Sequence, residues 1–407
     1  MKPSGIEWIG DIPDDWEVRK LLSLFKEHKD RNKNLEEQNL LSLSYGKIKR
    51  KDINNNDGLL PASFETYNIV EKGDIVFRLT DLQNDKRSLR TGIVTQRGII
   101  TSAYVTIRPK IKLDSRFYHY LYHMYDICKV FYGMGDGVRQ GMGFEDLKNI
   151  PTLIPPLKTQ QRIADYLDDK CGEIDATISK QKEIIEKLKA YKQSLISETV
   201  TKGLDKSSPL KPSGIEWIGD IPSHWEIKKL KFLVSLIDNK TKDGHSISLE
   251  NIESGTGKLI ETENTYDGDG ISFKENDLLF GKLRPYLAKV YLSALKGRAL
   301  GDFYVMRANK GTNPNFLKFV LLSDWFIKIV DSSTYGTKMP RASWDFTGGM
   351  RIPLPPISEQ DCISSYLETK CSEVDTFIIK KQNIIQKLDA YKKSLIFECV
   401  TGKHYFI

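Results

Sequence analysis

Two long stretches of the chain carry apolar residues at a helical spacing among charged ones. Each stretch follows a Pro-Pro pair, at 155–156 or 355–356, and runs without another proline to a glycine, Gly203 or Gly402. The apolar positions recur every three, four or seven residues over about four heptads, which is typical of a coiled-coil helix. We therefore predict one long helix in each stretch, ended by its glycine. The predicted seam residues are Ile178, Ile185, Leu188 and Leu195 in the first helix and Ile378, Ile385, Leu388 and Leu395 in the second.

The two predicted helices are equivalent, so each has the other as an obvious partner. Such an apolar stripe is also typical of an ordinary bundle core, but the equivalence favours an antiparallel pair related by a pseudo-twofold axis. Three polar residues, Gln181, Lys192 and Lys381, interrupt the seam and could help to fix its register. A helix of this kind would be about 60 Å long, which predicts a rigid spacer longer than the ~34 Å turn of B-DNA. The expected layers pair Ile178 with Leu395, Ile185 with Leu388, Leu188 with Ile385, and Leu195 with Ile378.

The chain contains an internal duplication. The leader KPSGIEWIGDIPDDWEVRKL at 2–21 returns at 211–230 with 16 of 20 positions identical, and 155–200 matches 355–400 at 24 of 46 positions without a gap. The segments between, 22–149 and 231–349, show no comparable identity. Shared parts of a duplicated chain predict a common task, such as docking the same partner twice, whereas divergent parts predict tasks that differ between the halves.

The duplication predicts an α+β protein of four parts. We expect two mixed α/β domains, separated by an antiparallel coiled coil of the two long helices in a pseudo-twofold arrangement. The expected boundaries place the first mixed domain at 1–154, the first helix at 155–203, the second mixed domain at 204–354 and the second helix at 355–407.

Composition excludes several classes of protein. With 407 residues, 40% hydrophobic and 28% charged, the chain is typical of globular protein rather than of disordered chain. The first twenty residues hold acids and prolines where a signal peptide needs an apolar core, and no run approaches the ~20 apolar residues of a membrane span. The five cysteines have no CxxC spacing, so we expect neither a disulfide framework nor a zinc site, and we expect a reducing, cytoplasmic location.

The distribution of charge is more informative than the net charge of +7. Residues 78–139 hold 11 Lys/Arg against 5 Asp/Glu, and residues 282–341 hold 11 against 3. Such clusters favour phosphate binding, because neutralised phosphates release counterions, and arginine can also read guanine in the major groove. For any single side chain the alternative is an ordinary solvated charge. The candidate DNA-binding residues are Arg78, Lys86, Arg87, Arg90, Arg97, Arg139, Gln140, Lys282, Arg284, Lys289, Arg298, Lys338 and Arg341.

Two glycine-flanked loops stand shortly before the two Pro-Pro pairs. GMGDGVRQGMG at 133–143 offers Arg139 and Gln140, and YGTKMPRAS at 335–343 offers Lys338 and Arg341. Flexible backbone together with an arginine and a further donor favours contact with DNA over a plain surface loop.

Several motifs with possible chemistry do not hold on inspection. NPNF at 313–316 lacks the second proline of the amino-methyltransferase motif and predicts a turn before a helix. SGTGKL at 254–259 lacks the P-loop residues at 252 and 259. The acids of PDDWEVRK at 13–20 are absent from the second copy and predict solvated surface, and His119 and His123 lack the glutamate of HExxH. We therefore expect no catalytic residues, metal site or cofactor in this chain.

The leader tryptophans are the remaining candidates for a shared task. Trp8 and Trp16, with Trp217 and Trp225 in the second copy, are most simply core anchors. Docking against a partner subunit that binds twice is the alternative.

These features together resemble the specificity subunits of type I restriction–modification systems, over essentially the whole chain. The resemblance rests on the leader GIEWIGDIPxxWE in two copies, on the junction IPLPPISEQ at 352–360 and on the long helix ending KLxAYKxSLI. The first junction, IPTLIPPLKTQ at 150–160, departs through Thr152-Leu153 and Thr159, and the first block lacks the GKLRPYL run of the second. Residue roles therefore do not transfer directly between the halves.

The resemblance implies two target-recognition domains, each reading half of a bipartite double-stranded DNA sequence. It also implies docking of two modification subunits, which use S-adenosylmethionine to methylate adenine, and of two restriction subunits, which use ATP with Mg²⁺. The specificity subunit itself would catalyse nothing, and no membrane is involved. The alternatives are a stand-alone bivalent DNA-binding regulator without enzymatic partners, a coiled-coil scaffold that binds no DNA, and a self-sufficient methyltransferase.

Overall fold

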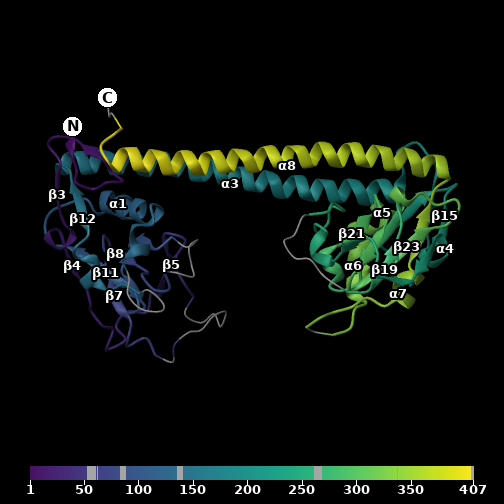
Figure 1. Cartoon of the computed structure of the whole chain (residues 1–407), viewed down its shortest axis with the longest axis horizontal. Coiled ribbons are helices and arrows are strands. Elements are labelled where there is room, and N and C mark those ends of the chain that lie inside the picture. The colour runs from purple at the N-terminus through teal and green to yellow at the C-terminus, as the bar shows by residue number, and fades with distance from the viewer. Residues whose placement is uncertain are drawn as a thin grey trace. The chain divides into compact units, whose positions relative to one another are not determined.

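A computed structural model of the chain describes residues 1–52, 61, 63–82, 89–134, 141–260, 268–336 and 338–404. It divides into two compact units, the first formed by 1–180 with 383–407 and the second by 181–382. Each unit contains one leader, one variable block and part of each long helix (Figure 1). Both chain termini belong to the first unit, where the Lys403 ammonium donates a hydrogen bond to the Ile9 carbonyl.

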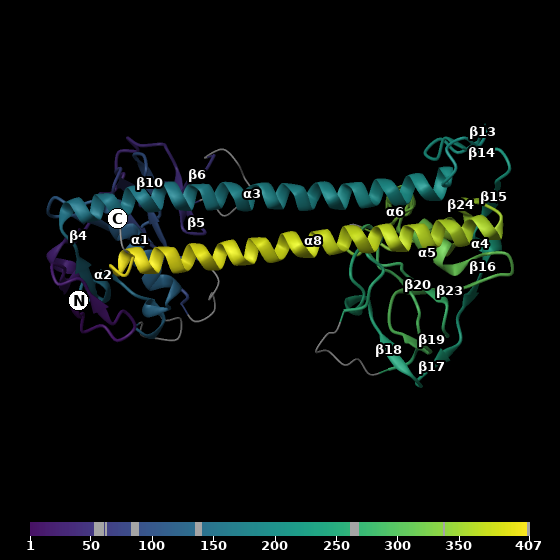
Figure 2. The same ribbon diagram turned by 90° about the horizontal axis from the view of Figure 1, so that it is seen from above.

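The two predicted long helices are present as α3 (Leu157–Lys202) and α8 (Ile357–Val400). Within each unit the two helices run side by side in opposite directions (Figures 1 and 2). Gly203 and Gly402 both have a φ of +72°, the left-handed conformation that ends a helix and that glycine adopts without strain. The predicted helices and their end signals are therefore confirmed.

The predicted seam faces inward to different degrees along the helices. In the first unit Ile178 and Leu395 are buried in one core, with Ile385 and Leu388 packed against it. In the second unit Leu195 packs against a core that contains Ile196 and Cys371. The pairing of the seam layers residue by residue stays a prediction. Of the remaining seam residues, Ile185 is buried and Leu188 and Ile378 are half-buried.

Each leader folds over the end of a long helix. A Cβ on Gly402 would lie 2.4 Å from Pro13, and one on Gly203 would lie 3.0 Å from the Trp225 ring, so both glycines are also required by close packing. Each leader forms a small hairpin and then a strand that pairs, antiparallel, with the strand before the Pro-Pro pair. These strands are β1 (Lys2–Pro3) with β2 (Asp11–Ile12), β3 (Glu17–Lys20) with β12 (Pro151–Ile154), β13 (Leu210–Pro212) with β14 (Asp220–Pro222), and β15 (Glu226–Lys229) with β24 (Arg351–Leu354).

The two variable blocks contain the same antiparallel sheet, although their sequences show no comparable identity. The strand order is β4-β11-β8-β9 in the first unit and β16-β23-β20-β21 in the second. The register also corresponds, because Ile107 opposes Ile75 in one sheet and Met306 opposes Leu278 in the other. The strands are β4 (Phe25–Glu27), β8 (Ile75–Phe77), β9 (Thr91–Ile93) and β11 (Val105–Pro109), then β16 (Val234–Ile237), β20 (Asp277–Gly281), β21 (Val290–Leu292) and β23 (Phe303–Ala308).

A second layer of strands differs between the units. In the second unit β17-β19-β22-β18 form one sheet, in which β18 and β22 are parallel. In the first unit β7 pairs with β10 and β5 pairs with β6. These strands are β5 (Leu41–Ser44), β6 (Lys47–Arg50), β7 (Asn68–Val70), β10 (Gly98–Ile100), β17 (Lys240–Thr241), β18 (His245–Ile247), β19 (Gly270–Phe273) and β22 (Gly297–Ala299).

Apolar helices cover the central sheets. In the first unit Phe117, Leu121 and Tyr122 of α1 (Ser115–Ile127) pack in one core with Phe25 and Phe77. In the second unit α5 (Pro314–Leu322) and α6 (Asp324–Ser332) occupy this role, with Phe316 and Phe326 in the core. The shorter elements are η1 (Leu21–Ser23), η2 (Val130–Gly133), α2 (Phe144–Leu147), α4 (Leu230–Leu233), η3 (Leu249–Asn251), η4 (Pro285–Leu287) and α7 (Trp344–Gly349).

The mixed helix and sheet content with two long helices confirms the predicted fold class. The division into four parts with its stated boundaries stays a prediction. Among the described residues, no helix combines the length and the apolar composition that a membrane span requires.

Candidate nucleic-acid interface

In the second unit, two of the predicted basic segments meet at one edge of the central sheet. The segment after β20 contributes Lys282 and Arg284, and the loop before α7 contributes Arg341. Backbone hydrogen bonds join the two segments, from the Arg284 amide to the Pro340 carbonyl at 2.8 Å and from the Ala342 amide to the Lys282 carbonyl at 2.9 Å. We call the surface formed by Lys282, Arg284, Lys338 and Arg341 the basic edge.

Asp302 lies at the centre of the basic edge and holds two of its cations. Its Oδ2 accepts hydrogen bonds from Nε and Nη2 of Arg341, at 3.2 and 2.9 Å, and its Oδ1 lies 3.9 Å from Nζ of Lys282. The hydrogen bond with Asp302 raises the pKa of Arg341 above its ordinary value. The carboxylate thus fixes one side of the exposed guanidinium and orients it, which favours directional contact with an acceptor.

Exposed aromatic and thioether side chains border the basic edge. Tyr335 is 83% exposed, and Tyr286 and Met339 are each 54% exposed. Arg284 and Ala288 have φ values of +51° and +47°, so the residue at each end of the turn 285–287 adopts a left-handed conformation that is uncommon outside glycine. Cations interleaved with exposed tyrosines are typical of surfaces that contact the nucleic-acid backbone. The sequence interpretation used the cations and passed over Tyr335, although that residue begins the loop it singled out.

Two predicted DNA-binding residues point into the protein instead. Arg90 and Lys289 occupy equivalent places, because the Arg78 amide bonds the Arg90 carbonyl and the Gly281 amide bonds the Lys289 carbonyl. The buried Arg90 guanidinium donates to the Thr80 carbonyl at 2.7 Å and to the Tyr132 hydroxyl at 3.1 Å, and Lys289 donates to the Ile252 carbonyl. The sequence predicts that both residues contact DNA at the surface. Their side chains instead bind backbone carbonyls of neighbouring loops from within the protein.

The other candidates lie apart from the basic edge or outside the described residues. Arg97 forms ion pairs with Glu37 and Glu71, which neutralise its charge locally. Arg298 stands on β22 in the second layer of strands, and Arg78 is half-buried at the end of β8. The predicted residues that lie outside the described part of the chain are Lys86, Arg87, Arg139 and Gln140.

The first unit closes its glycine-flanked loop in the same way as the second. The Met142 amide donates to the Leu79 carbonyl at 2.9 Å, as the Ala342 amide donates to the Lys282 carbonyl. This equivalence places Gly141 where the second unit has Arg341, and Leu79 where it has Lys282. The same backbone position therefore carries different chemistry in the two units.

Comparison with known proteins agrees with this geometry. A family model described as "Type I restriction modification DNA specificity domain" matches residues 13–190. The type I restriction enzyme MjaVIII specificity subunit of Methanocaldococcus jannaschii is 24% identical over 420 residues, which cover 96% of this chain and 93% of the relative. The EcoDI specificity subunit of Escherichia coli is 22% identical over 283 residues, or 63% of each chain.

Solved structures share the fold. A chain from a structure on complex assembly and conformational transition of the type I R-M system superposes with a TM-score of 0.71 at 14% identity, covering 97% of this chain and all of that one. The HsdS subunit from Thermoanaerobacter tengcongensis gives a TM-score of 0.52 at 15% identity, covering 97% and 98%. Relatives that are named type I specificity subunits thus match this chain over nearly its whole length, and a type I specificity domain matches residues 13–190.

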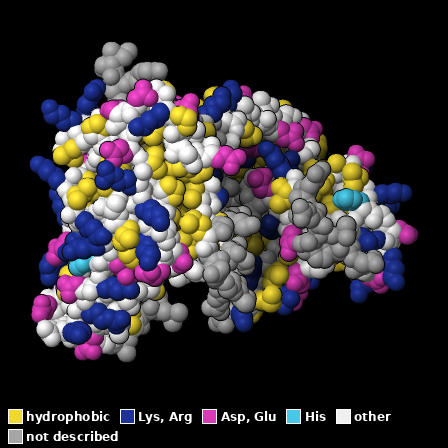
Figure 3. Space-filling model, turned by 60° about the vertical axis from the view of Figure 1, so that its left-hand side comes forward, with side chains coloured by type: hydrophobic (Ala, Val, Ile, Leu, Met, Phe, Trp, Pro, Cys, Tyr) yellow, Lys and Arg dark blue, Asp and Glu magenta, His cyan; other side chains and the backbone are white. Residues whose placement is uncertain are grey.

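One face of the molecule is mixed in charge. On the face shown in Figure 3, lysines and arginines are scattered among acidic and hydrophobic side chains rather than gathered in one band. The basic edge is defined by its local geometry, in which two segments are joined beside Asp302.

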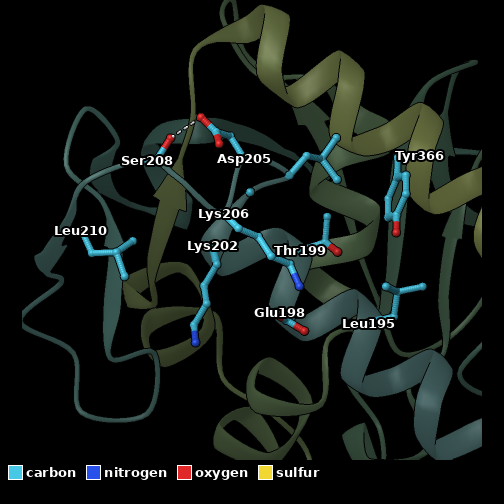
Figure 4. Close-up of a pocket in the computed structure, with 11 residues that line it drawn as sticks. Leu195, Glu198, Thr199, Lys202, Asp205, Lys206, Ser208, Leu210 and Tyr366 are labelled. Atoms are coloured by element: carbon cyan, nitrogen blue, oxygen red, sulfur yellow. Dashed lines mark hydrogen bonds between the residues drawn. The ribbon is translucent and has the colours of Figure 1, made fainter.

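Several pockets lie on the surface of the second unit. One, of about 260 Å³, lies where the chain leaves α3 and turns towards the second leader (Figure 4). There Asp205 faces Ser208 and accepts its hydroxyl at 3.0 Å, while Tyr366 of α8 lies on the opposite side. The hydrogen bond between Ser208 and Asp205 stabilises this turn. Among the described residues, no group of three or more His, Cys, Asp or Glu side chains could hold a metal ion.

Two expectations about sequence motifs can be compared with the structure. NPNF begins α5, where the Asn313 side chain accepts the amides of Asn315 and Phe316, as the predicted turn requires. Trp16 and Trp225 are buried, as predicted. Trp217, however, is 48% exposed, so its predicted role as a core anchor is wrong, whereas Trp8 packs on Tyr125 with ring centroids 4.9 Å apart.

Proposed function

We propose that this chain is the DNA-recognition subunit of a type I restriction–modification complex and that each unit's variable block reads one half of a bipartite target. The observation that carries the proposal is the duplicated sheet, which presents equivalent loop positions with unlike residues, such as Gly141 in one unit and Arg341 in the other. Two sheets of the same strand order that carry different loop residues suit the recognition of two different half-sites.

The shared elements suit a second task, the docking of identical enzymatic subunits. The two leaders are identical at 16 of 20 positions and the two long helices at 24 of 46, so a partner that binds one copy can bind the other. We propose that two modification subunits and two restriction subunits assemble on this chain. In this proposal methylation with S-adenosylmethionine and cleavage with ATP and Mg²⁺ are carried out by those subunits, while this chain acts in the cytoplasm without catalysis or a cofactor of its own.

Block replacement in the reconstituted complex tests the proposal. Residues 231–349 would be exchanged for the corresponding block of another specificity subunit, and methylated adenines would be mapped on a plasmid library. We expect one half of the target sequence to change and the other half and the spacing to persist, with the reciprocal result for 22–149. A target that changes throughout, or that is not bipartite, would overturn the proposal.

Copurification and salt dependence separate the alternatives. A specificity subunit should retain two methyltransferase subunits per chain, whereas a stand-alone regulator would retain none. Phosphate contacts predict that affinity for the target duplex falls steeply between about 50 and 200 mM salt. A scaffold that binds no DNA would show no such dependence, and methyl transfer by the isolated chain would identify it as an enzyme.

A further inference from the structure

Two equivalent aspartates each connect three parts of their own unit. Asp375 of α8 accepts a hydrogen bond at Oδ1 from Nζ of Lys192 on α3, and at Oδ2 from Nζ of Lys258 in the variable block, both at 2.7 Å. One carboxylate therefore joins its own helix, the neighbouring helix and the recognition domain of the second unit.

The first unit repeats this arrangement from different residues. Asp175 of α3 accepts Nζ of Lys392 on α8 at 2.6 Å and Nζ of Lys47 in the variable block at 3.1 Å. Asp175 and Asp375 are equivalent in the duplicated helices, as are Lys192 and Lys392. We call each set of one aspartate and two lysines a clasp, the first clasp being Asp175, Lys392 and Lys47 and the second being Asp375, Lys192 and Lys258.

The helix arm of each clasp is the more buried one. Lys192, which interrupts the apolar seam in sequence, is only 9% exposed, and Asp375 is 16% exposed. Burial raises the pKa of Asp375, but hydrogen bonds from Lys192 and Lys258 and their charges more than offset it, so that the net pKa lies below its ordinary value. A buried ion pair in a helix seam specifies register, because any shift leaves a charge without its partner.

The domain arm of the second clasp leads to the basic edge. Lys258 ends a tight turn in which the Glu253 amide bonds the Lys258 carbonyl at 2.9 Å. In the same turn the Gly255 amide donates to the Ala288 carbonyl at 3.0 Å, and Ala288 caps the strained turn that begins at Arg284. A short chain of hydrogen bonds therefore connects the carboxylate of Asp375 to the segment that presents Arg284.

The domain arm of the first clasp comes from an unrelated segment. Lys47 begins β6 in the β5–β6 hairpin, and Leu43 and Ile48 of this hairpin lie against Gly92 of β9 so closely that a Cβ on Gly92 would meet Leu43 at 2.6 Å. Two blocks without common sequence therefore each supply a lysine to the equivalent carboxylate. The recurrence of the ion pair from different segments is hard to attribute to inherited packing alone.

We propose that Asp175 and Asp375 are positioning residues, each of which fixes the orientation of one recognition domain on the long helices and so sets how that domain meets its half-site. The proposal rests on the function proposed above. It predicts that the two half-sites are positioned independently, by separate clasps. It also explains why Lys192 stands in an otherwise apolar seam.

The test uses the full chain in the reconstituted complex and a series of target duplexes whose spacer differs by one base pair at a time. We expect Asp375→Asn to lower the preference for the native spacer and for the second half-site roughly tenfold, within the usual range of coupling between sites. The first half-site should stay unaffected. Asp175→Asn should give the reciprocal pattern.

Lys258→Ala separates positioning from folding, because it removes only the exposed domain arm and leaves the Lys192 pair in place. It should reproduce the loss of spacer preference and should accelerate hydrogen exchange at the Glu253 and Gly255 amides. Lys242→Ala is the matched control, since Lys242 is an exposed lysine of the same unit that lies 3.7 Å from Asp269. This control should change neither measurement.

Three outcomes would overturn the proposal. They are wild-type exchange and wild-type spacer preference in Lys258→Ala, an equal loss at both half-sites in Asp375→Asn, and a change in Lys242→Ala as large as that in Lys258→Ala. If the wild-type complex reads no bipartite target, the proposed function fails instead. In that case the exchange measurement still decides whether Lys258 holds the turn.

Discussion

The variable blocks of the two units agree in their frame and differ at their edges. Both build the same four-stranded order, and both place a buried aspartate against an arginine, Asp74 with Arg108 and Asp277 with Arg307. Gln160 and Gln360 also play one role, since each accepts a hydrogen bond from the backbone amide of the N-cap residue of a helix that precedes it in the variable block, α1 or α5. A few buried polar contacts therefore define the fold, and the exposed loops are free to diverge.

The exposed loops at the ends of the two sheets differ because equivalent positions hold different residues. The second unit has Arg341 anchored by Asp302, whereas the first has Gly141 at that place and keeps Arg90 inside. The comparison teaches that divergence in such a chain concerns the surface that meets the target, while similarity in the buried frame can persist without detectable identity.

Breaking the shared ion pair is the most severe test of the common frame. Asp277 is 1% exposed and accepts Nε and Nη2 of Arg307 at 2.8 and 2.7 Å. Asp277→Ala should lower the unfolding free energy by about 3 kcal/mol, because the Arg307 guanidinium and the Lys274 amide both lose the carboxylate that they bind. Asp74→Ala should cost the first unit a similar amount, as measured by urea unfolding.

The matched control for this comparison is a surface pair. Arg19 and Glu17 are both more than half exposed, so Arg19→Ala should change stability by no more than about 0.5 kcal/mol. If either aspartate variant is as stable as the control, the two blocks do not depend on a common buried pair.

The tryptophans of the two leaders test how far the environments of equivalent residues have diverged. Trp8 lies against Tyr125 and Phe397, whereas the corresponding Trp217 is 48% exposed. Trp8→Ala should therefore cost about 2 kcal/mol and Trp217→Ala less than about 0.5 kcal/mol. Acrylamide should quench the fluorescence of Trp217 more than that of Trp8. Equal costs for the two variants would mean that the copies still share one environment.

The duplication and the long helices were predictable because their signals are periodic and extended. Ile178 and Leu395 could be assigned to a seam from spacing alone, and Gly203 and Gly402 could be assigned as ends. The common sheet was not predictable, because its strands are only three to six residues long and the inner strands β8 and β20 are buried on both sides. Such short apolar runs carry neither alternation nor identity.

The candidate site was predictable only in part, because a charged residue in a sequence does not show whether its side chain points to solvent or into the protein. Arg90 and Lys289 stand in basic runs as Arg284 does, yet they point inward to backbone carbonyls. Trp8 packs on Phe397, whereas the equivalent position of the other long helix is Ser197, which has no ring. Long-range contacts of this kind decide exposure, and a local pattern does not contain them.

Low pH should destabilise the first unit more than the second. The covering helix α1 of the first unit contains two histidines, whereas α5 and α6 of the second unit contain none. Burial lowers the pKa of His119 to about 4, and burial with the charges of His119, Lys392 and Lys393 lowers that of His123 to about 3. The unfolded chain, with a histidine pKa near 6.5, therefore binds more protons below that pH. The contribution of the two neutral histidines to the stability of the first unit should be complete above pH 6.5 and should fall by on the order of 2 kcal/mol for each histidine as the pH approaches 5.

Hydrogen exchange measured at pH 7 and pH 5 checks this asymmetry after correction for the intrinsic rates. The amides of α1 should lose protection at the lower pH, while those of α5 and α6, which contain no histidine, should keep theirs. The double variant His119→Gln with His123→Gln should remove the difference. Equal loss of protection in both units would place the acid sensitivity elsewhere.

The mildest change sharpens the comparison at the basic edge itself. Arg341→Ala should weaken recognition of the second half-site alone, by about 1–3 kcal/mol if the guanidinium reads a base. Asp302→Asn should weaken discrimination less, since it loosens the orientation of the guanidinium and keeps the charge. Lys338→Ala, in the same loop, should instead lower affinity for all sequences and reduce the salt dependence.

Titration of the reconstituted complex against matched and half-site-substituted duplexes separates these outcomes. A base contact at Arg341 requires that its loss be largest on the cognate second half-site and absent on duplexes altered there. Uniform weakening on every duplex would make Arg341 a phosphate contact, equivalent to Lys338. In that case the difference between Gly141 and Arg341 would tune affinity, and the sequence preference of the second unit would have to come from other loop residues.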